Sequence, residues 1–280
     1  MLVMKIDNLV EGSVIKRPSR LVKSPYVADV IINNTEILAH SASLGCCGLC
    51  EAGSSILLSS MKNNKNDSKK CSYSVQLSII HEKNHEIIIG VYPKLAELLV
   101  ENCLTKNYLS ILQNIKRYKR ETTIFVENKV DSRFDFTGID QNGVPFIMEV
   151  KNVPLADYED ILSKDRKKKC YDDRAYNSKI AYFPDGYRKK STETISPRAL
   201  KHVRELTLIK KESTTRCIMC YVIQRDDVDR FQPSIIDPDY RLAVKEAIDA
   251  GVEIITLVIK WTRDGYAYFV KDDLTITPFL

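Results

Sequence analysis

Three side chains that could do chemistry together lie in the middle of the chain: Asp135, Glu149 and Lys151. Residues 140–143 between them are typical of a turn, and the apolar residues on both sides predict two strands joined as a hairpin. Alternate side chains of a strand share a face, so Glu149 and Lys151 are expected on one side and Val150 on the other, toward the core. With this turn, Asp135 falls roughly opposite Glu149.

Such a hairpin end offers hard oxygen ligands. The carboxylates of Asp135 and Glu149 and the carbonyl of Val150 could hold Mg²⁺ or Mn²⁺, an ion that keeps several waters. Lys151 would stand beside the attacking water or the charge that develops on a phosphodiester. An exposed Glu-x-Lys is usually only a cross-strand charge pair. The apolar surroundings favour the metal site, because charge in a central strand is costly unless it is paired or metal-bound.

Length and composition are those of a globular protein. The chain has 280 residues, with 44% hydrophobic and 28% charged residues, which suits one large or two moderate domains. Its apolar runs are shorter than a membrane span, and residues 1–11 lack the apolar centre of a signal peptide. We therefore expect an intracellular, cytoplasmic protein without a membrane segment.

Positive charge is concentrated in one part of the chain. The net charge is +5, but residues 164–190 hold ten Lys or Arg against four Asp. This basic run could contact phosphates directly after the metal-binding strand. It could equally be a solvated loop, and both descriptions can hold together.

The chain has eight cysteines, and two clusters contain C-x₂-C. A four-cysteine zinc site is formally available, but Cys217 and Cys220 lie in a strand-like run that would direct them to opposite faces. Only the cluster of Cys46, Cys47 and Cys50 has suitable chemistry, and its role stays open. Reduced, buried thiols account for the other cysteines, without a disulfide framework.

The first 90 residues predict short strands. Runs at 12–17, 26–32, 36–40, 54–61, 72–81 and 86–91 alternate with turn residues, a series typical of a small closed or half-closed barrel. Arg17 and Arg20 near its first turn could offer cations to nucleic acid. The alternative is that they only aid solubility.

The pattern then changes to helices interleaved with strands, which indicates a separate α/β domain. Helices are expected from Pro93, from Ser196-Pro197, and from Pro238 with an Asp237 cap and Gly251 at its end. On the second helix, Lys201 and His202 lie away from the apolar face. The strands are expected near 122–126, then at 179–183, 217–224, 253–260 and 266–271.

Ordered blocks across the chain resemble the sugar fermentation stimulation protein A (SfsA) family. The blocks are Arg133-Phe134-Asp135-Phe136, Glu149-Val150-Lys151-Asn152-Val153, Phe183-Pro184-Asp185, Lys201-His202-Val203-Arg204-Glu205-Leu206, Val222-Ile223-Gln224-Arg225 and Ile236-Asp237-Pro238-Asp239. Residues 43–48 differ from the corresponding family stretch, and extra chain follows Leu155, so the resemblance is to a divergent member with insertions.

The resemblance implies an α/β (α+β) protein of two domains. Residues 1–88 would form an OB-like small β-barrel, and residues 89–280 a mixed sheet flanked by helices, similar to PD-(D/E)xK nucleases, with a basic insertion near 156–178. The nuclease pattern assigns a first-helix acid to Glu101, with Glu97 nearby, beside Asp135, Glu149 and Lys151. The family is also described as DNA-binding and as affecting sugar metabolism.

We therefore predict a DNA-binding protein with Mg²⁺- or Mn²⁺-dependent nuclease activity. Arg133, Lys201 and His202 would position phosphate in the same cleft, although a histidine beside a lysine on a helix can instead bond a neighbouring carboxylate. Two alternatives remain: a non-catalytic DNA-binding regulator of sugar-metabolism genes, and an OB protein that binds single-stranded RNA. Turnover, substrate preference, pathway and assembly as a homo-oligomer stay open.

Overall fold

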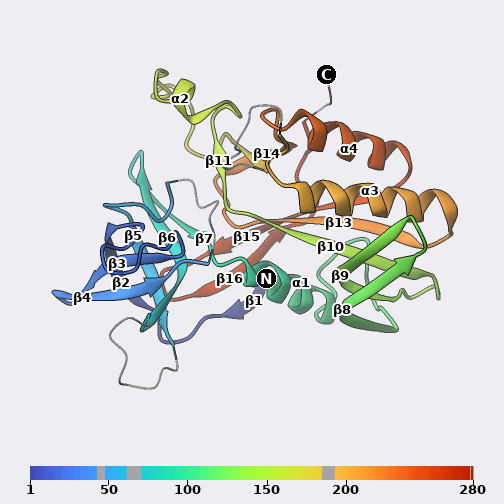
Figure 1. The fold of residues 1–280 in the computed structure, drawn as a ribbon, viewed down its shortest axis with the longest axis horizontal. Helices are drawn as coiled ribbons and strands as arrows, with labels where there is room; N and C mark the ends of the chain where they lie inside the picture. The colour runs from blue at the N-terminus through green and yellow to red at the C-terminus, as the bar shows by residue number, and fades with distance from the viewer. Residues whose placement is uncertain (43–47, 62–70, 185–192, 278, 280) are drawn as a thin grey trace.

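The computed structural model describes residues 1–42, 48–61, 71–184, 193–277 and 279. A six-stranded sheet lies at the left of Figure 1, and a seven-stranded sheet crosses its centre and right. Helix α1 (Lys94–Thr105) packs on one face of the larger sheet, and α3 (Pro197–Glu212) and α4 (Pro238–Asp249) pack on the other. This mixed α+β architecture confirms the predicted fold class.

The six-stranded sheet closes on itself as a small barrel. Its order is β4-β3-β2-β5-β6-β7, and an additional parallel pairing of β4 with β6 joins five strands into a circuit. Such a five-stranded circuit is barrel-like, as expected from the series of short strands, and the OB-like fold that the family resemblance implies stays a prediction. The strands are β2 (Val10–Lys16), β3 (Val27–Ile32), β4 (Thr35–His40), β5 (Ser55–Ser60), β6 (Tyr73–Glu82) and β7 (His85–Gly90).

The seven-stranded sheet has the order β1-β16-β15-β13-β10-β9-β8. Its three central strands β10, β13 and β15 are parallel, and antiparallel strands flank them. The strands are β1 (Leu2–Lys5), β8 (Arg117–Val126), β9 (Val130–Ile139), β10 (Pro145–Val153), β13 (Arg216–Ile223), β15 (Glu253–Trp261) and β16 (Tyr266–Lys271).

The first strand of the chain belongs to this second sheet. β1 pairs antiparallel with β16, and the terminal amino group of Met1 donates to the carbonyl of Phe269 at 3.1 Å. The chain therefore starts in the large sheet, forms the barrel and returns. The division into residues 1–88 and 89–280 stays a prediction, and residues 2–5 were not expected to form a strand there.

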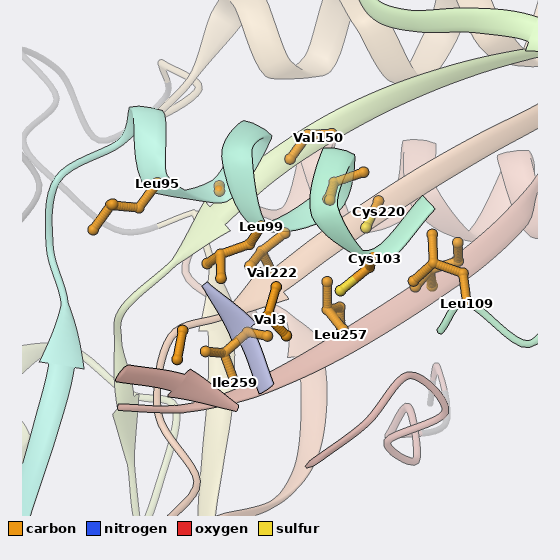
Figure 2. Packing of buried hydrophobic residues seen from close by; sticks show 14 of the residues in the cluster. Val3, Leu95, Leu99, Cys103, Leu109, Val150, Cys220, Val222, Leu257 and Ile259 are labelled. Carbon is orange, nitrogen blue, oxygen red and sulfur yellow. The ribbon is translucent and has the colours of Figure 1, made fainter. Parts of the chain in front are cut away.

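The central strands of the large sheet are buried on both faces, so they are apolar on both sides. In β13, Cys217 faces the core under α3 and α4, while Cys220 faces the core under α1. Figure 2 shows Cys220 and Val150 pointing toward α1, with Cys103 of that helix beside them. This confirms that Cys217 and Cys220 face opposite sides and that Val150 points into the core.

The insertion after β10 packs against the barrel. It contains β11 (Ala156–Asp157) and α2 (Ser163–Arg166) and leads into β12 (Lys179–Phe183), which pairs in a three-stranded sheet with β11 and β14 (Val228–Pro233). The Lys83 ammonium in the β6–β7 turn donates to the carbonyl of Tyr171 at 2.6 Å, and His85 stacks on Tyr176 with ring centroids 3.5 Å apart. These contacts anchor residues 171–176.

Candidate metal centre

Strands β9 and β10 part where the acidic residues lie. Their ladder is regular from the turn to Phe136 opposite Met148, and the same register continued would place Asp135 opposite Glu149. Beyond that point the main chains no longer pair, and the Asp135 Oδ2 atom accepts the backbone N–H of Val150 at 2.7 Å. A side chain thus replaces a main-chain acceptor and fixes Asp135 at the end of the ladder.

Glu149 is held by two donors on one oxygen. Its Oε1 atom accepts from the Lys151 ammonium and lies 2.5 Å from Nδ1 of His202 on α3. Its Oε2 atom is buried and has no hydrogen-bond partner among the residues that the structure describes. Because the Glu149 residue is only 3% exposed, water does not readily satisfy this oxygen, and an unpaired buried anionic oxygen is unfavourable.

The two carboxyl groups have opposite pKa shifts. Burial, reinforced by the nearby charge of Glu149, raises the pKa of Asp135 to about 7. Burial would also raise the pKa of Glu149, but the hydrogen bond from His202 and the charge of Lys151 lower it instead. Glu149 is therefore the ionised member, and a second negative charge on Asp135 requires a nearby cation.

Two acids of α1 face this region. The charge of Glu97 contributes to the raised pKa of Asp135. The predicted helix acid, Glu101, accepts hydrogen bonds on both oxygens, from the Tyr118 hydroxyl at 3.1 Å and from Arg120 at 2.7 Å. Arg120 also bonds Glu97 at 2.8 Å. The contribution of Glu97 to this pKa is the smallest of its causes, so the choice between Glu97 and Glu101 as the helix acid stays a prediction.

The cations expected around the centre differ in their surroundings. His202, expected to face phosphate, is instead only 3% exposed and bonds Glu149. Arg133 and Lys201 are exposed, with 57% and 52% of their side chains accessible. Lys201 donates to the backbone carbonyl of Asp131 at 2.5 Å, so it lies beside the start of β9, the strand that holds Arg133.

The barrel arginines lie in the other unit of the fold and are engaged there. Arg20 donates to the buried carboxylate of Asp29 at 3.0 Å and also bonds Glu36. The Arg17 guanidinium donates to the Pro25 carbonyl at 2.8 Å. The structure thus does not bring these two side chains together with the acids of β9 and β10.

The basic run is largely paired where the structure describes it. Lys179, counted with the surface cations, is instead buried, and its ammonium lies 2.8 Å from both Asp227 and Glu82. Asp227 also receives two hydrogen bonds from Arg225. Lys168 and Lys169 form surface pairs within the insertion. Residues 188–190 of this run, like Cys46 and Cys47, lie outside the described residues.

Comparison with known families assigns the chain. The family model described as "Sugar fermentation stimulation protein RE domain" (SfsA) matches residues 94–265. The chain belongs to the SfsA family. A sugar fermentation stimulation protein homolog of Nostoc sp. is 30% identical over 271 residues, covering 96% of each chain, and a homolog of Trichormus variabilis shows the same identity and coverage.

A solved member of the SfsA family has the same fold. The structure of Pyrococcus furiosus SfsA in complex with Ca²⁺ matches with a TM-score of 0.74 at 20% identity, covering 99% of this chain and all of the other. The match extends over both sheets, because it leaves almost no part of either chain uncovered. Within the described ranges, this chain shows no helix that is long and apolar enough to cross a membrane.

The donor set suits a hard divalent cation. Asp135 and Glu149 provide carboxylate oxygens, the ligands that Mg²⁺, Mn²⁺ and Ca²⁺ prefer. In the part of the chain that the structure describes, no three His, Cys, Asp or Glu side chains are grouped to hold a metal ion. An ion here would therefore complete its coordination with water and main-chain oxygen, for which the Val150 carbonyl remains the predicted donor. The unpaired Oε2 of Glu149 fits such an ion.

Proposed function

We propose that this SfsA-family protein is a DNA-binding phosphodiesterase that depends on Mg²⁺ or Mn²⁺, with its centre at Asp135, Glu149 and Lys151. The observation that carries the proposal is the unpaired Oε2 of Glu149, buried beside a second carboxyl whose pKa is raised to about 7 by burial and by Glu149. A bound cation would pair with the Glu149 oxygen and would also neutralise the negative charge of an ionised Asp135. A purely structural charge pair between Glu149 and Lys151 would do neither.

Each side chain then has a distinct task. Asp135 and Glu149 would hold the ion, which when bound would stabilise charge on the phosphate and make a water molecule more acidic. The Val150 N–H keeps Asp135 in place. Lys151 presents a positive charge next to Glu149, where it can orient the attacking water or balance developing negative charge. A carboxylate of α1, either Glu97 or the predicted Glu101, would assist through the ion's water.

Exposed cations near the start of β9 would bind the DNA backbone. Arg133 and Lys201 lie on two elements, β9 and α3, that meet there, and these elements also hold Asp135 and His202. Phosphate contacts of this kind provide affinity without sequence preference. The Ca²⁺ complex of the Pyrococcus furiosus protein agrees with a role for divalent ions, since Ca²⁺ takes oxygen ligands.

A cleavage assay tests the proposal. Purified protein is incubated with supercoiled plasmid and, separately, with single-stranded DNA, in Mg²⁺, in Mn²⁺ and in EDTA. We expect metal-dependent cleavage that Glu149→Gln abolishes. Glu212→Gln is the matched control, because Glu212 is an exposed acid paired with Lys129 at the surface. Tight DNA binding without cleavage under either metal would contradict the enzyme and support a non-catalytic DNA-binding regulator.

A further inference from the structure

We propose that His202 is a positioning residue that fixes the carboxylate of Glu149 through Oε1 and thereby keeps Oε2 available for the cation. This inference rests on the proposed metal centre. It gives the buried imidazole a task, whereas from the sequence this histidine was expected either to position phosphate or to bond a neighbouring carboxylate.

The first step is a count of acceptor sites. Each carboxylate oxygen offers about two lone-pair directions. Lys151 and His202 both direct donors to Oε1, so that oxygen is filled. Oε2 is buried and is unpaired within the described part of the chain. Two donors on one oxygen and none on the other prevent the two oxygens from exchanging freely by rotation of the carboxylate.

The second step is that His202 is itself held rigidly. The His202 residue is only 3% exposed, and its ring packs against Phe134 with ring centroids 5.6 Å apart and an angle of 53° between the planes. The neighbouring Val203 and Leu206 of α3 are fully buried in the core beneath the helix. Lys201 ties the same turn of the helix to the carbonyl of Asp131. A histidine fixed on several sides can hold the carboxylate of Glu149 in one orientation.

The third step is that Lys151 alone would not suffice. Its ammonium sits on a flexible four-carbon chain, and three rotatable donors can follow the carboxylate in several orientations. The imidazole is planar and has few rotamers. Removing a residue that hydrogen-bonds a metal-binding side chain typically weakens metal affinity about 10–100-fold.

Three substitutions separate hydrogen bonding from packing. In His202→Asn the amide nitrogen lies as many bonds from Cα as Nδ1 does, so the donor to Glu149 is retained. In His202→Gln the amide group extends one bond further, toward the position of Nε2. His202→Leu fills similar space without a donor. If the Nδ1 hydrogen bond is what matters, Asn should retain the function that Gln and Leu lose.

The test is calorimetric titration with Mn²⁺ of the full-length protein and these variants. We expect His202→Leu and His202→Gln to weaken Mn²⁺ binding about tenfold or more, and His202→Asn to stay within about threefold of wild type. Wild-type affinity in His202→Leu, or equal affinities for Asn and Gln, would overturn the inference. If the Leu variant does not fold by circular dichroism, the comparison of Asn with Gln decides.

The same titration distinguishes failure of the inference from failure of the proposed function. A wild-type protein that binds no Mn²⁺, or a Glu149→Gln variant that binds it as tightly as wild type, overturns the metal centre itself and removes the basis for a role of His202. Binding that is lost in Glu149→Gln but unchanged in every His202 variant leaves the metal centre standing and overturns the inference alone.

Discussion

The carboxylate of Asp135 accepts the backbone N–H of Val150 at 2.7 Å, just past the last paired residues of β9 and β10. At this point the two strands have separated enough for a side chain to take the place of a main-chain acceptor. The acid is therefore positioned by the backbone of the strand that holds Glu149 and Lys151. The relative placement of these three residues depends on this separation.

Replacing Asp135 should stabilise the metal-free protein while removing its metal binding. Burial and Glu149 raise the pKa of Asp135 to about 7, so at about pH 8 an unfavourable charge is forced on the folded state. Asn keeps an acceptor for Val150 without that charge. We expect Asp135→Asn to increase the free energy of unfolding in EDTA by about 1–3 kcal/mol, measured by urea denaturation. A loss of stability in EDTA, or stabilisation of the variant by added Mn²⁺, would contradict this assignment.

The two acids of α1 should differ in importance. Glu97 makes a small contribution to the raised pKa of Asp135 and accepts from Arg120 on one oxygen, whereas both oxygens of Glu101 are occupied by Tyr118 and Arg120. We expect Glu97→Gln to lower the Mn²⁺-dependent cleavage rate about tenfold or more, and Glu101→Gln to lower it less than about threefold. Single-turnover kinetics at saturating Mn²⁺ measure both variants. The reverse order would restore Glu101 as the helix acid of the centre.

Removing exposed cations should weaken DNA binding uniformly across sequences. Arg133→Ala and Lys201→Ala are each expected to lower affinity several-fold and to reduce the slope of log affinity against log salt concentration by about 1. Fluorescence anisotropy at several salt concentrations provides both quantities. Lys245→Ala is the control, because Lys245 is a similarly exposed lysine on α4 that pairs with Asp249. Identical salt slopes for all variants would exclude Arg133 and Lys201 from the interface.

The buried charges around Asp227 should determine part of the acid sensitivity. Burial alone would raise the pKa of Asp227, but the hydrogen bonds and charge of Arg225, together with Lys179, lower it. A carboxyl with a depressed folded-state pKa stabilises the protein above its unfolded-state pKa, and this contribution is lost as the pH falls through the folded-state value. Asp227→Asn should therefore cost about 3–5 kcal/mol near neutral pH.

Denaturation in urea from neutral pH to below about pH 4 measures this dependence. The difference between wild type and Asp227→Asn should shrink at the acid end, because the wild-type carboxyl becomes protonated there. Asp226→Asn is the matched control: its partner Lys260 is 56% exposed, and such a surface pair contributes about 1 kcal/mol or less. Equal effects of the two substitutions would contradict the role assigned to the buried cluster.

Local sequence patterns were sufficient for most of the elements. The strand expected at 179–183 is β12, and the helix expected from Ser196-Pro197 is α3. The cap expected at Asp237 accepts the backbone N–H of Tyr240. Residues 2–5 and 228–233 were missed, because each is a short strand whose partner lies elsewhere in the chain. Pairing over long sequence separation leaves little local signal.

The placement of Asp135 opposite Glu149 could be predicted from the sequence, because a two-residue period and one turn relate these acids. The side chains that contact these acids could not be predicted, since tertiary packing brings them together. His202 could be placed on a helix, but its contact with Glu149 depends on how α3 crosses β10. From the sequence, Lys179 counted as one more surface cation. In the structure it is buried and pairs with Asp227 and Glu82. Charge counts along a sequence do not distinguish these cases.

The pairing of β1 with β16 links protein synthesis to the maturation of this fold. Val3, fully buried beneath α1, stays without its sheet until residues 266–271 have left the ribosome, and contacts between such distant segments form slowly. Until that moment β1 lacks the strand with which it pairs. Of the strands in the sheet that holds the acids, β16 comes last in sequence, so a chain without residues 266–271 would leave β1 unpaired and make β15 the edge strand.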